Sequence, residues 1–391
     1  MAEAFIVEAV RTAVGRKKGA LREVRPDDLA ALTLQELVKR AGVDPANVDD
    51  VVMGCVSQVG EQGFNIARVA ALAAGWPDTV TGTSVNRQCG SSQQAINFAA
   101  QAVLSGAMDL VVGAGVESMT RIPMGSDAVS GMGGQPWMGA PSLYSKRYEF
   151  VMQHMSAEMV AEKYGITRAQ CEDIALRSHQ NAATAREKGW FAREIFAVDG
   201  LDKEGNALKF AADEGIRPDT SLEKLAQLQP VTKPDGVVTA GTSSQISDGA
   251  AAVLVASADA VKRYGFKPRA RIVSMAVAGV DPLIMLTGPM PATQKALARA
   301  GLKPDDVSLY EVNEAFASVV GAFQKELAVP SDRVNVNGGA CALGHPLGAS
   351  GARLITTLLH EMERRDVRYG VSTMCIGFGQ GIATLLDRKL S

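Results

Sequence analysis

The segment RAGVDP at residues 40–45 recurs as RAGLKP at residues 299–304, an offset of 259 residues between positions 40 and 299. The same offset places Ser91 on Ser350, and each of these serines precedes a segment with helical periodicity. Matches that keep their order along a chain indicate an internal duplication. The chain therefore contains two related halves.

Each half carries the same succession of patterns: apolar strand, amphipathic helix, strand, glycine-rich loop, helix and strand. This alternation predicts an α/β fold in which helices pack on a mostly parallel sheet. At an offset of 260 residues, one more than the first, the strand end at Gly115 aligns with Cys375. We expect an N-terminal half over residues 1–118, completed by about 249–268, and a C-terminal half over residues 269–391.

Residues 119–248 break this pattern and form a predicted insertion. Helical periodicity runs over residues 156–188, and the methionine-rich segment 152–159 overlaps its start. Methionines at such a density usually fill a core. We expect the insertion to be a lid or a binding subdomain.

Composition restricts the class of protein. The 391 residues are 47% apolar and 21% charged, with a formal net charge of -2, so no overall positive field attracts nucleic acid or an anionic membrane surface. No apolar run approaches the roughly 20 residues of a membrane span. Five cysteines, an odd number in a long chain, argue against a disulfide framework and favour a reducing compartment, so we expect a cytoplasmic protein.

Two cysteines lie in glycine-bounded loops: Cys89 in NRQCGSS at residues 86–92, and Cys375 in MCIGFGQG at residues 374–381. A cysteine at the start of a helix has a stabilised thiolate, and a second thiol can carry a proton near neutral pH. A buried, inert cysteine is the alternative for Cys89. The adjacent Gly90 favours a sulfur that a substrate can approach.

His345 lies in the glycine-rich segment 338–351, where the backbone is shaped for close approach. We consider it a candidate base, and a structural role is the alternative. Phosphate binding by these glycines is disfavoured because no lysine-serine pair follows them. The remaining histidines, His154, His179 and His360, are expected at the surface.

The segment EVNEAFA at residues 311–317 follows an apolar strand. Asn313 can orient a water or donate to an oxyanion, while Glu314 can complement a helix start. After Cys375, the backbone around Gly377 can donate N–H groups to a developing oxyanion. Alone, these residues do not decide a function.

In order along the chain, CGSS at 89–92, NEAFA at 313–317, GHP at 344–346 and MCIG at 374–377 resemble the four signature blocks of the thiolase family. The resemblance extends over about residues 6–386. It implies the thiolase fold, in which two duplicated α/β halves form a five-layer arrangement with a loop domain inserted in the first.

The resemblance also implies roles. Cys89 matches the nucleophile that accepts the acyl group, His345 its activator, and Cys375 the acid and base acting on the acetyl α-carbon. Asn313 matches the residue that holds a water in one oxyanion hole beside His345. The backbone N–H groups of Cys89 and Gly377 match the second hole.

For CoA, the resemblance points to Arg217 against the adenine, Ser244 on the pantetheine arm, and Ala315 with Phe316 as a wall of the tunnel. Without the resemblance, Arg217 is equally well a solvated charge. CoA and a 3-ketoacyl-CoA are the implied substrates, with no metal ion or redox cofactor. A homodimer or homotetramer is implied as well.

Two departures bear on the substrate. The His-Met-Gly pattern of relatives with small substrates falls here on residues 152–154, so its contacts are not transferred. An aromatic that narrows the acyl pocket in those relatives aligns with Thr232, which indicates room for a longer or bulkier chain.

We therefore expect a degradative 3-ketoacyl-CoA thiolase. An acetyltransferase that forms acetoacetyl-CoA is the alternative with the same residues. A ketoacyl synthase is disfavoured because it typically has histidine where this chain has Cys375. A non-catalytic acyl-CoA-binding protein is disfavoured because none of the four chemical residues is missing.

Overall fold

The computed structural model describes residues 2–129 and 142–390. Within them, eleven strands form one sheet, whose long strands follow the order β4-β3-β5-β9-β1-β10-β13-β12-β11. The bounds are β1 Ala4–Thr12, β3 Asp50–Gly54, β4 Thr81–Val85, β5 Leu110–Ser118, β9 Ser247–Ser257, β10 Ala270–Gly279, β11 Leu309–Val312, β12 Tyr369–Ile376 and β13 Gln380–Asp387. The short strands β2 (Gly15–Arg16) and β6 (Ile195–Phe196) pair with β9 and β1.

The strand directions correct the expectation of a mostly parallel sheet. Parallel pairs are confined to β4-β3-β5 at one end, β11-β12 at the other, and the short β6 beside β1. The pairs that join β5, β9, β1, β10, β13 and β12 are antiparallel. Direction depends on how each connection returns the chain to the sheet, and the apolar pattern of a strand does not encode it.

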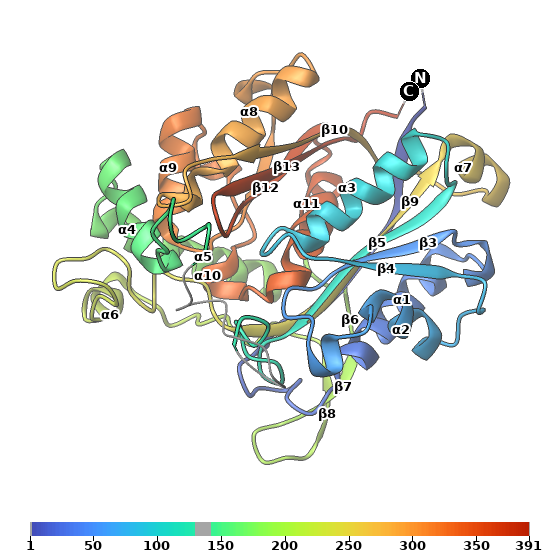
Figure 1. The fold of residues 1–391 in the computed structure, drawn as a ribbon, viewed down its shortest axis with the longest axis horizontal. Coiled ribbons are helices and arrows are strands. Elements are labelled where there is room, and N and C mark those ends of the chain that lie inside the picture. Colours follow the sequence, from blue (N-terminus) through green and yellow to red (C-terminus); the bar gives the residue numbers. More distant parts are fainter. Residues whose placement is uncertain (1, 130–141, 391) are drawn as a thin grey trace.

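Helices and strands alternate in five layers (Figure 1). The outer helices α1 (Pro26–Ala41) and α2 (Ile66–Ala73) pack on the strands of the N-terminal half. The outer helices α8 (Pro289–Arg299) and α9 (Ala317–Leu327) pack on those of the C-terminal half. The central helices α3 (Ser91–Leu104) and α11 (Ser350–Arg365) lie between the two parts of the sheet.

Strand β9 shows how the sequence produces these layers. Ala252 and Leu254 face α1 and α2, whereas Val253 and Val255 face α3 and α11. Successive side chains of a strand point to opposite faces, so a strand covered on both faces is apolar throughout. This accounts for the uninterrupted apolar run in β9.

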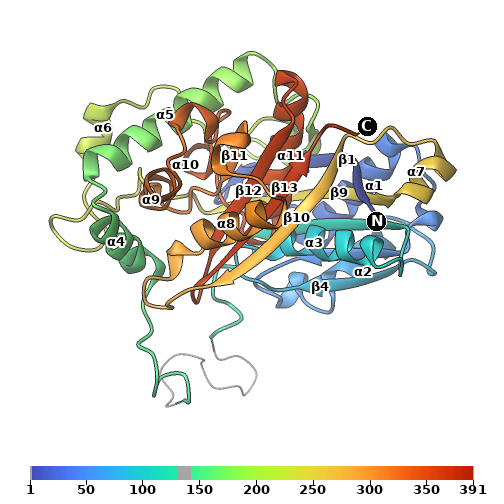
Figure 2. The same cartoon turned by 90° about the horizontal axis from the view of Figure 1, so that it is seen from above.

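The segment between β5 and β9 adds α4 (Gln153–Tyr164), α5 (Arg168–Glu187), α6 (Leu222–Ala226) and the hairpin of β7 (Val198–Leu201) with β8 (Ala207–Phe210). Helices α4 and α5 confirm the helical periodicity predicted for residues 156–188. The described residues on either side of 130–141 extend away from the two halves (Figure 2). The domain boundaries stay a prediction.

The remaining helices are short. They are α7 Ala258–Tyr264, α10 Ala340–Leu343 and the 3₁₀ turns Pro45–Asn47, Gly60–Gln62, Met285–Thr287, Pro304–Asp306, Ser331–Arg333 and Leu347–Ala349. Of the helices in the described ranges, none is both long and apolar enough to span a membrane.

The predicted duplication is confirmed. Helices α3 and α11 begin at Ser91 and Ser350, and strands β5 and β12 begin at Leu110 and Tyr369, so both pairs keep the offset seen in the sequence. The two central helices are therefore equivalent elements of the two halves.

Glycines in β5 let the central layer approach the sheet closely. A methyl group on Gly115 would lie 2.1 Å from the carbonyl oxygen of Gly348 and 2.4 Å from Cβ of Ser92. Contacts this short do not occur between real side chains and backbone, so the strand requires glycine here.

We predict that Gly115→Ala lowers the free energy of unfolding by about 3 kcal/mol, because the methyl overpacks a rigid junction. Denaturation in urea measures the change. Gly279→Ala is the matched control, since Gly279 ends a strand at the surface and a methyl there meets no atom within 4 Å. Equal midpoints for the two variants would contradict the packing argument.

Candidate active site

Cys89 lies in the loop that joins β4 to the start of α3. Gln88 has a positive φ of 46°, which is rare for a residue other than glycine, and Gly90 is the N-cap of the helix. Two hydrogen bonds fix the turn: Gln88 N–H donates to Asn86 Oδ1 at 2.8 Å, and Ser91 Oγ donates to the Gln88 carbonyl at 2.6 Å. A strained backbone conformation such as that of Gln88 persists where surrounding contacts hold it. The turn places Cys89 at the N-terminus of α3.

The starts of α3 and α11 touch each other. Ala352 N–H donates to Ser92 Oγ at 2.9 Å, and a methyl on Gly351 would lie 2.3 Å from the backbone nitrogen of Gln93. The loops that precede the two helices are therefore adjacent, and Cys89 and Leu347 belong to one buried apolar cluster.

His345 lies in the loop before α11 and is 4% exposed. Ser350 Oγ donates its proton to the Pro346 carbonyl at 2.8 Å, so it accepts from Nδ1–H of His345. This pairing leaves a lone pair on Nε2, which lies 3.3 Å from Asn313 Nδ2. Burial, and then the charge of Arg353, lower the pKa of His345 to about 3, so the imidazole is neutral near pH 7 and Nε2 carries no proton.

Asn313 follows β11 directly. Its N–H donates to the Thr373 carbonyl on β12 at 3.0 Å, continuing the parallel pairing of these strands. Its side-chain Oδ1 is buried and has no partner among the described residues. A buried acceptor without a partner is able to hold a water or a substrate donor.

Cys375 lies at the end of β12, at the same edge of the sheet as Asn313. It is 1% exposed, and burial, followed by the neighbouring Cys89, raises its pKa. Burial likewise raises the pKa of Cys89 to about 11, against the opposing effect of the nearby backbone N–H groups of Cys89 and Gly377. Both thiols are therefore protonated near neutral pH, and a base is needed to generate the nucleophile.

The residues expected to bind CoA lie around this centre. Ser243 forms an isolated bridge with Phe316, and Ser244 N–H donates to the Ala315 carbonyl at 3.0 Å. The next carbonyl, that of Gln245, accepts from His345 N–H at 3.1 Å. The structure thus brings Ser244, Ala315 and Phe316 together beside His345.

Arg217 is exposed. Its segment is tied to the centre by Gln245 Nε2, which donates to the Gly215 carbonyl at 3.0 Å. Arg217 N–H donates to His179 Nδ1 at 3.1 Å. Its guanidinium is thus available to a ligand that enters from solvent.

Two histidines expected at the surface are buried, which corrects that expectation. His179 on α5 is 3% exposed and His360 on α11 is 6% exposed. Burial lowers the pKa of His179 to about 4 and that of His360 to about 3, so both are neutral packing residues. Polar residues next to each histidine in the sequence favoured an exposed position, and the sequence did not indicate that each histidine lies on the buried face of its helix.

Sequence reasoning missed two residues of the centre. The side-chain amide of Gln153, at the start of α4, lowers the pKa of the Cys89 thiol against the effect of burial. Ser350 fixes the tautomer of His345. The duplication could have singled out Ser350, whereas no motif or spacing identifies Gln153.

Thr232, expected beside the acyl chain, is half-buried, and its hydroxyl donates to Glu158 on α4 at 2.6 Å. It therefore helps to hold α4.

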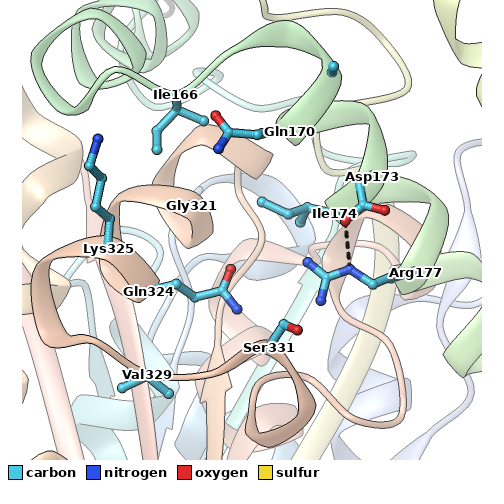
Figure 3. A pocket seen from close by; sticks show the side chains of 11 residues that line it. Ile166, Gln170, Asp173, Ile174, Arg177, Gly321, Gln324, Lys325, Val329 and Ser331 are labelled. Carbon is cyan, nitrogen blue, oxygen red and sulfur yellow. Dashed lines mark ion pairs between the residues drawn. The ribbon is translucent and has the colours of Figure 1, made fainter.

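Two hollows lie away from these residues. One of about 620 Å³ lies between α5 and α9, with Arg177 and Asp173 paired at its rim (Figure 3). Another of about 720 Å³ is lined by residues that include Arg193, Phe266 and His360. Neither is lined by Cys89, Asn313, His345 or Cys375. The described residues contain no group of three or more side chains arranged to bind a metal ion.

Comparisons with known proteins agree with this geometry. Family models described as the thiolase N-terminal and C-terminal domains match residues 4–259 and 266–388. The chain is 48% identical to the steroid 3-ketoacyl-CoA thiolase FadA6 of Mycobacterium tuberculosis, over 99% of this chain and 95% of that one.

Two solved structures are similar over their whole length. The acetyl-CoA acetyltransferase of Bacillus anthracis has a TM-score of 0.91 and 40% identity, and human mitochondrial 3-ketoacyl-CoA thiolase has a TM-score of 0.89 and 39% identity, each with 99% of both chains covered.

We predict that alkylation of Cys89 in the free protein accelerates with pH. Because burial raises the thiol pKa to about 11, the thiolate fraction is small at pH 7 and rises about tenfold per unit up to pH 10. Iodoacetamide labelling, followed by peptide mapping, measures the rate at Cys89. A rate that is flat between pH 7 and 10 would show a thiolate already formed at neutral pH.

Proposed function

The chain belongs to the thiolase family, and we propose that it is a 3-ketoacyl-CoA thiolase, an acyltransferase that uses CoA to cleave a 3-ketoacyl-CoA into acetyl-CoA and a shortened acyl-CoA. One observation carries this proposal. Cys89 of the N-terminal half lies near Cys375 of the C-terminal half and shares a buried cluster with Leu347, in the loop that carries His345, while Nε2 of His345 lies 3.3 Å from Asn313 Nδ2.

In the first half-reaction, Nε2 of His345 accepts the proton of Cys89. The thiolate attacks C3 of the substrate, and the oxyanion that forms accepts hydrogen bonds from the N–H groups of Cys89 and Gly377. The C2–C3 bond then breaks, the acyl group remains on Cys89, and Cys375 protonates the enolate of acetyl-CoA. The protonated His345 and a water held by Asn313 stabilise that enolate.

In the second half-reaction, CoA takes the acyl group. The Cys375 thiolate accepts the proton of the CoA thiol, with His345 as the neighbouring proton carrier. The CoA sulfur attacks the thioester, the bond to Cys89 breaks, and Cys89 recovers its proton from His345. Thiols and one imidazole supply every proton transfer, so we propose no metal ion or redox cofactor.

For CoA itself, we propose that Ser244 contacts the pantetheine arm, that Ala315 and Phe316 form one wall of its tunnel, and that Arg217 lies against the adenine. The contacts between residues 243–244 and 315–316 support a common channel that leads to His345.

The size of the acyl group distinguishes the two candidate functions. Thr232, where relatives with small substrates have an aromatic, favours a longer or bulkier chain. The similarity to an acetyl-CoA acetyltransferase keeps the synthesis of acetoacetyl-CoA as the second candidate.

We also propose a homodimer or homotetramer in the cytoplasm. Among the strands of the described residues, β4 lies at an edge of the sheet with one neighbour, β3, and Phe64 is 98% exposed. Proteins rarely leave a strand edge and a large aromatic uncovered, so a second copy of the chain would stabilise this face. The five cysteines are free thiols, which fits a reducing compartment.

We predict that kcat/KM for CoA-dependent cleavage rises with chain length from acetoacetyl-CoA upward. Loss of absorbance of the 3-ketoacyl-CoA enolate follows each reaction. Activity confined to acetoacetyl-CoA would favour the acetyltransferase. Failure to cleave any member of the series would overturn the assignment as a thiolase.

We predict that Cys375→Ala lowers kcat for cleavage by about a thousandfold, because the enolate loses its proton donor, while acylation of Cys89 by a simple acyl-CoA is retained. Cys171→Ala is the control, since Cys171 is a buried thiol in the packing of α5. Cleavage by Cys375→Ala at the wild-type rate would remove Cys375 from the mechanism.

A further inference from the structure

Gln153 connects the inserted segment to the nucleophile. It is the first residue of α4 and is half-buried. Its side-chain amide acts on the Cys89 thiol together with the backbone N–H groups of Cys89 and Gly377, and all three lower the pKa of that thiol against the effect of burial. A methyl group on Gly377 would lie 3.6 Å from Gln153 Nε2, so the amide lies next to Gly377 in the loop after Cys375.

Aromatic rings fix the chain just before Gln153. Phe150 and Phe378 have ring centroids 6.1 Å apart, and Tyr144 packs edge-on against Phe378 at 5.9 Å. Phe378 follows Gly377 directly and has a positive φ of 62°. The loop after Cys375 and the segment that leads into α4 are therefore held together at the site.

Further hydrogen bonds hold helix α4 in place. Glu158 accepts hydrogen bonds from Val237 N–H at 3.0 Å, Val238 N–H at 2.9 Å and the Thr232 hydroxyl. Ser318 Oγ on α9 donates to the Ala157 carbonyl at 3.0 Å. A donor on such a fixed helix loses little freedom when it binds, so its interaction with sulfur is preorganised.

We propose that Gln153 is a third hydrogen-bond donor to the Cys89 sulfur and that through it the inserted segment controls the reactivity of the nucleophile. The amide stabilises negative charge on the sulfur when His345 has taken its proton. It does so again when CoA attacks the acyl-enzyme, because the electron pair of the breaking C–S bond then returns to Cys89. This second role rests on the proposed thiolase function, whereas the first does not.

The test removes the donor and keeps the size of the side chain. Gln153→Met has similar length and no N–H, and Gln153→Glu presents a carboxylate that repels a thiolate. At pH 8, where little of Cys89 is ionised, we expect iodoacetamide to label Cys89 about tenfold more slowly in Gln153→Met, since a pKa one unit higher means a tenfold smaller thiolate fraction. Gln153→Glu is expected to be slower still.

Gln229→Met is the matched control, because Gln229 is exposed in the same inserted segment, and its labelling rate should equal that of the wild type. Circular dichroism verifies folding, and if Gln153→Met does not fold, the rate in Gln153→Glu decides. Labelling at the wild-type rate in the folded variants overturns the proposal.

The proposed role of Gln153 and the proposed thiolase function can each be contradicted without the other. Labelling needs no substrate, so a slower rate in Gln153→Met stands even if the wild type cleaves no 3-ketoacyl-CoA. If the wild type does cleave, Gln153→Met should lower kcat about tenfold and leave KM for CoA unchanged, as expected for a group that acts on the sulfur. A rise in KM alone would instead make Gln153 a binding residue.

Discussion

The close packing of α3 against α11 is the constraint on which the rest of the structure depends. These equivalent helices form the middle layer, and their backbones touch where Gly351 meets Gln93. Close approach requires glycine on the facing elements, which is why β5 carries Gly115 opposite the loop before α11. The contact forces the two preceding loops together, and those loops carry Cys89 and His345. A duplicated fold thereby creates one asymmetric site from two equivalent positions.

The site divides its chemistry between helix starts and strand ends. Cys89 and His345 precede helices, whereas Asn313 follows β11 and Cys375 lies at the end of β12, and the carboxyl ends of these parallel strands share an edge. Burial acts in opposite directions on the two kinds of group, because it disfavours charge in both: it raises the pKa of the thiols and lowers that of the imidazole. The resting site is therefore uncharged at its reacting atoms. In the proposed mechanism, charge develops only when the proton moves from the sulfur of Cys89 to Nε2 of His345, beside donors that are already in place.

Much of this could be predicted from the sequence because local pattern determines it. The repeat placed the starts of α3 and α11 correctly, and apolar runs such as β9 identified buried strands. Strand direction could not be predicted, since it depends on the path of each connection, and the mostly parallel sheet was wrong. The burial of His179 and His360 depends on which helix face meets a neighbour. Gln153 could not be predicted because Gln153 and Cys89 belong to different elements of the fold, and the segment around Gln153 contains no recognisable motif. The roles of the catalytic residues remain predictions that rest on geometry and resemblance.

The claim at the centre of this account is that Cys89 becomes acylated when the C2–C3 bond breaks. Intact-protein mass spectrometry after mixing with a 3-ketoacyl-CoA in the absence of free CoA tests it directly, with peptide mapping to locate the adduct. The account predicts one adduct with the mass of the shortened acyl group, on the peptide that contains Cys89, together with released acetyl-CoA. Release of acetyl-CoA with no adduct, or with an adduct on another residue, would contradict it.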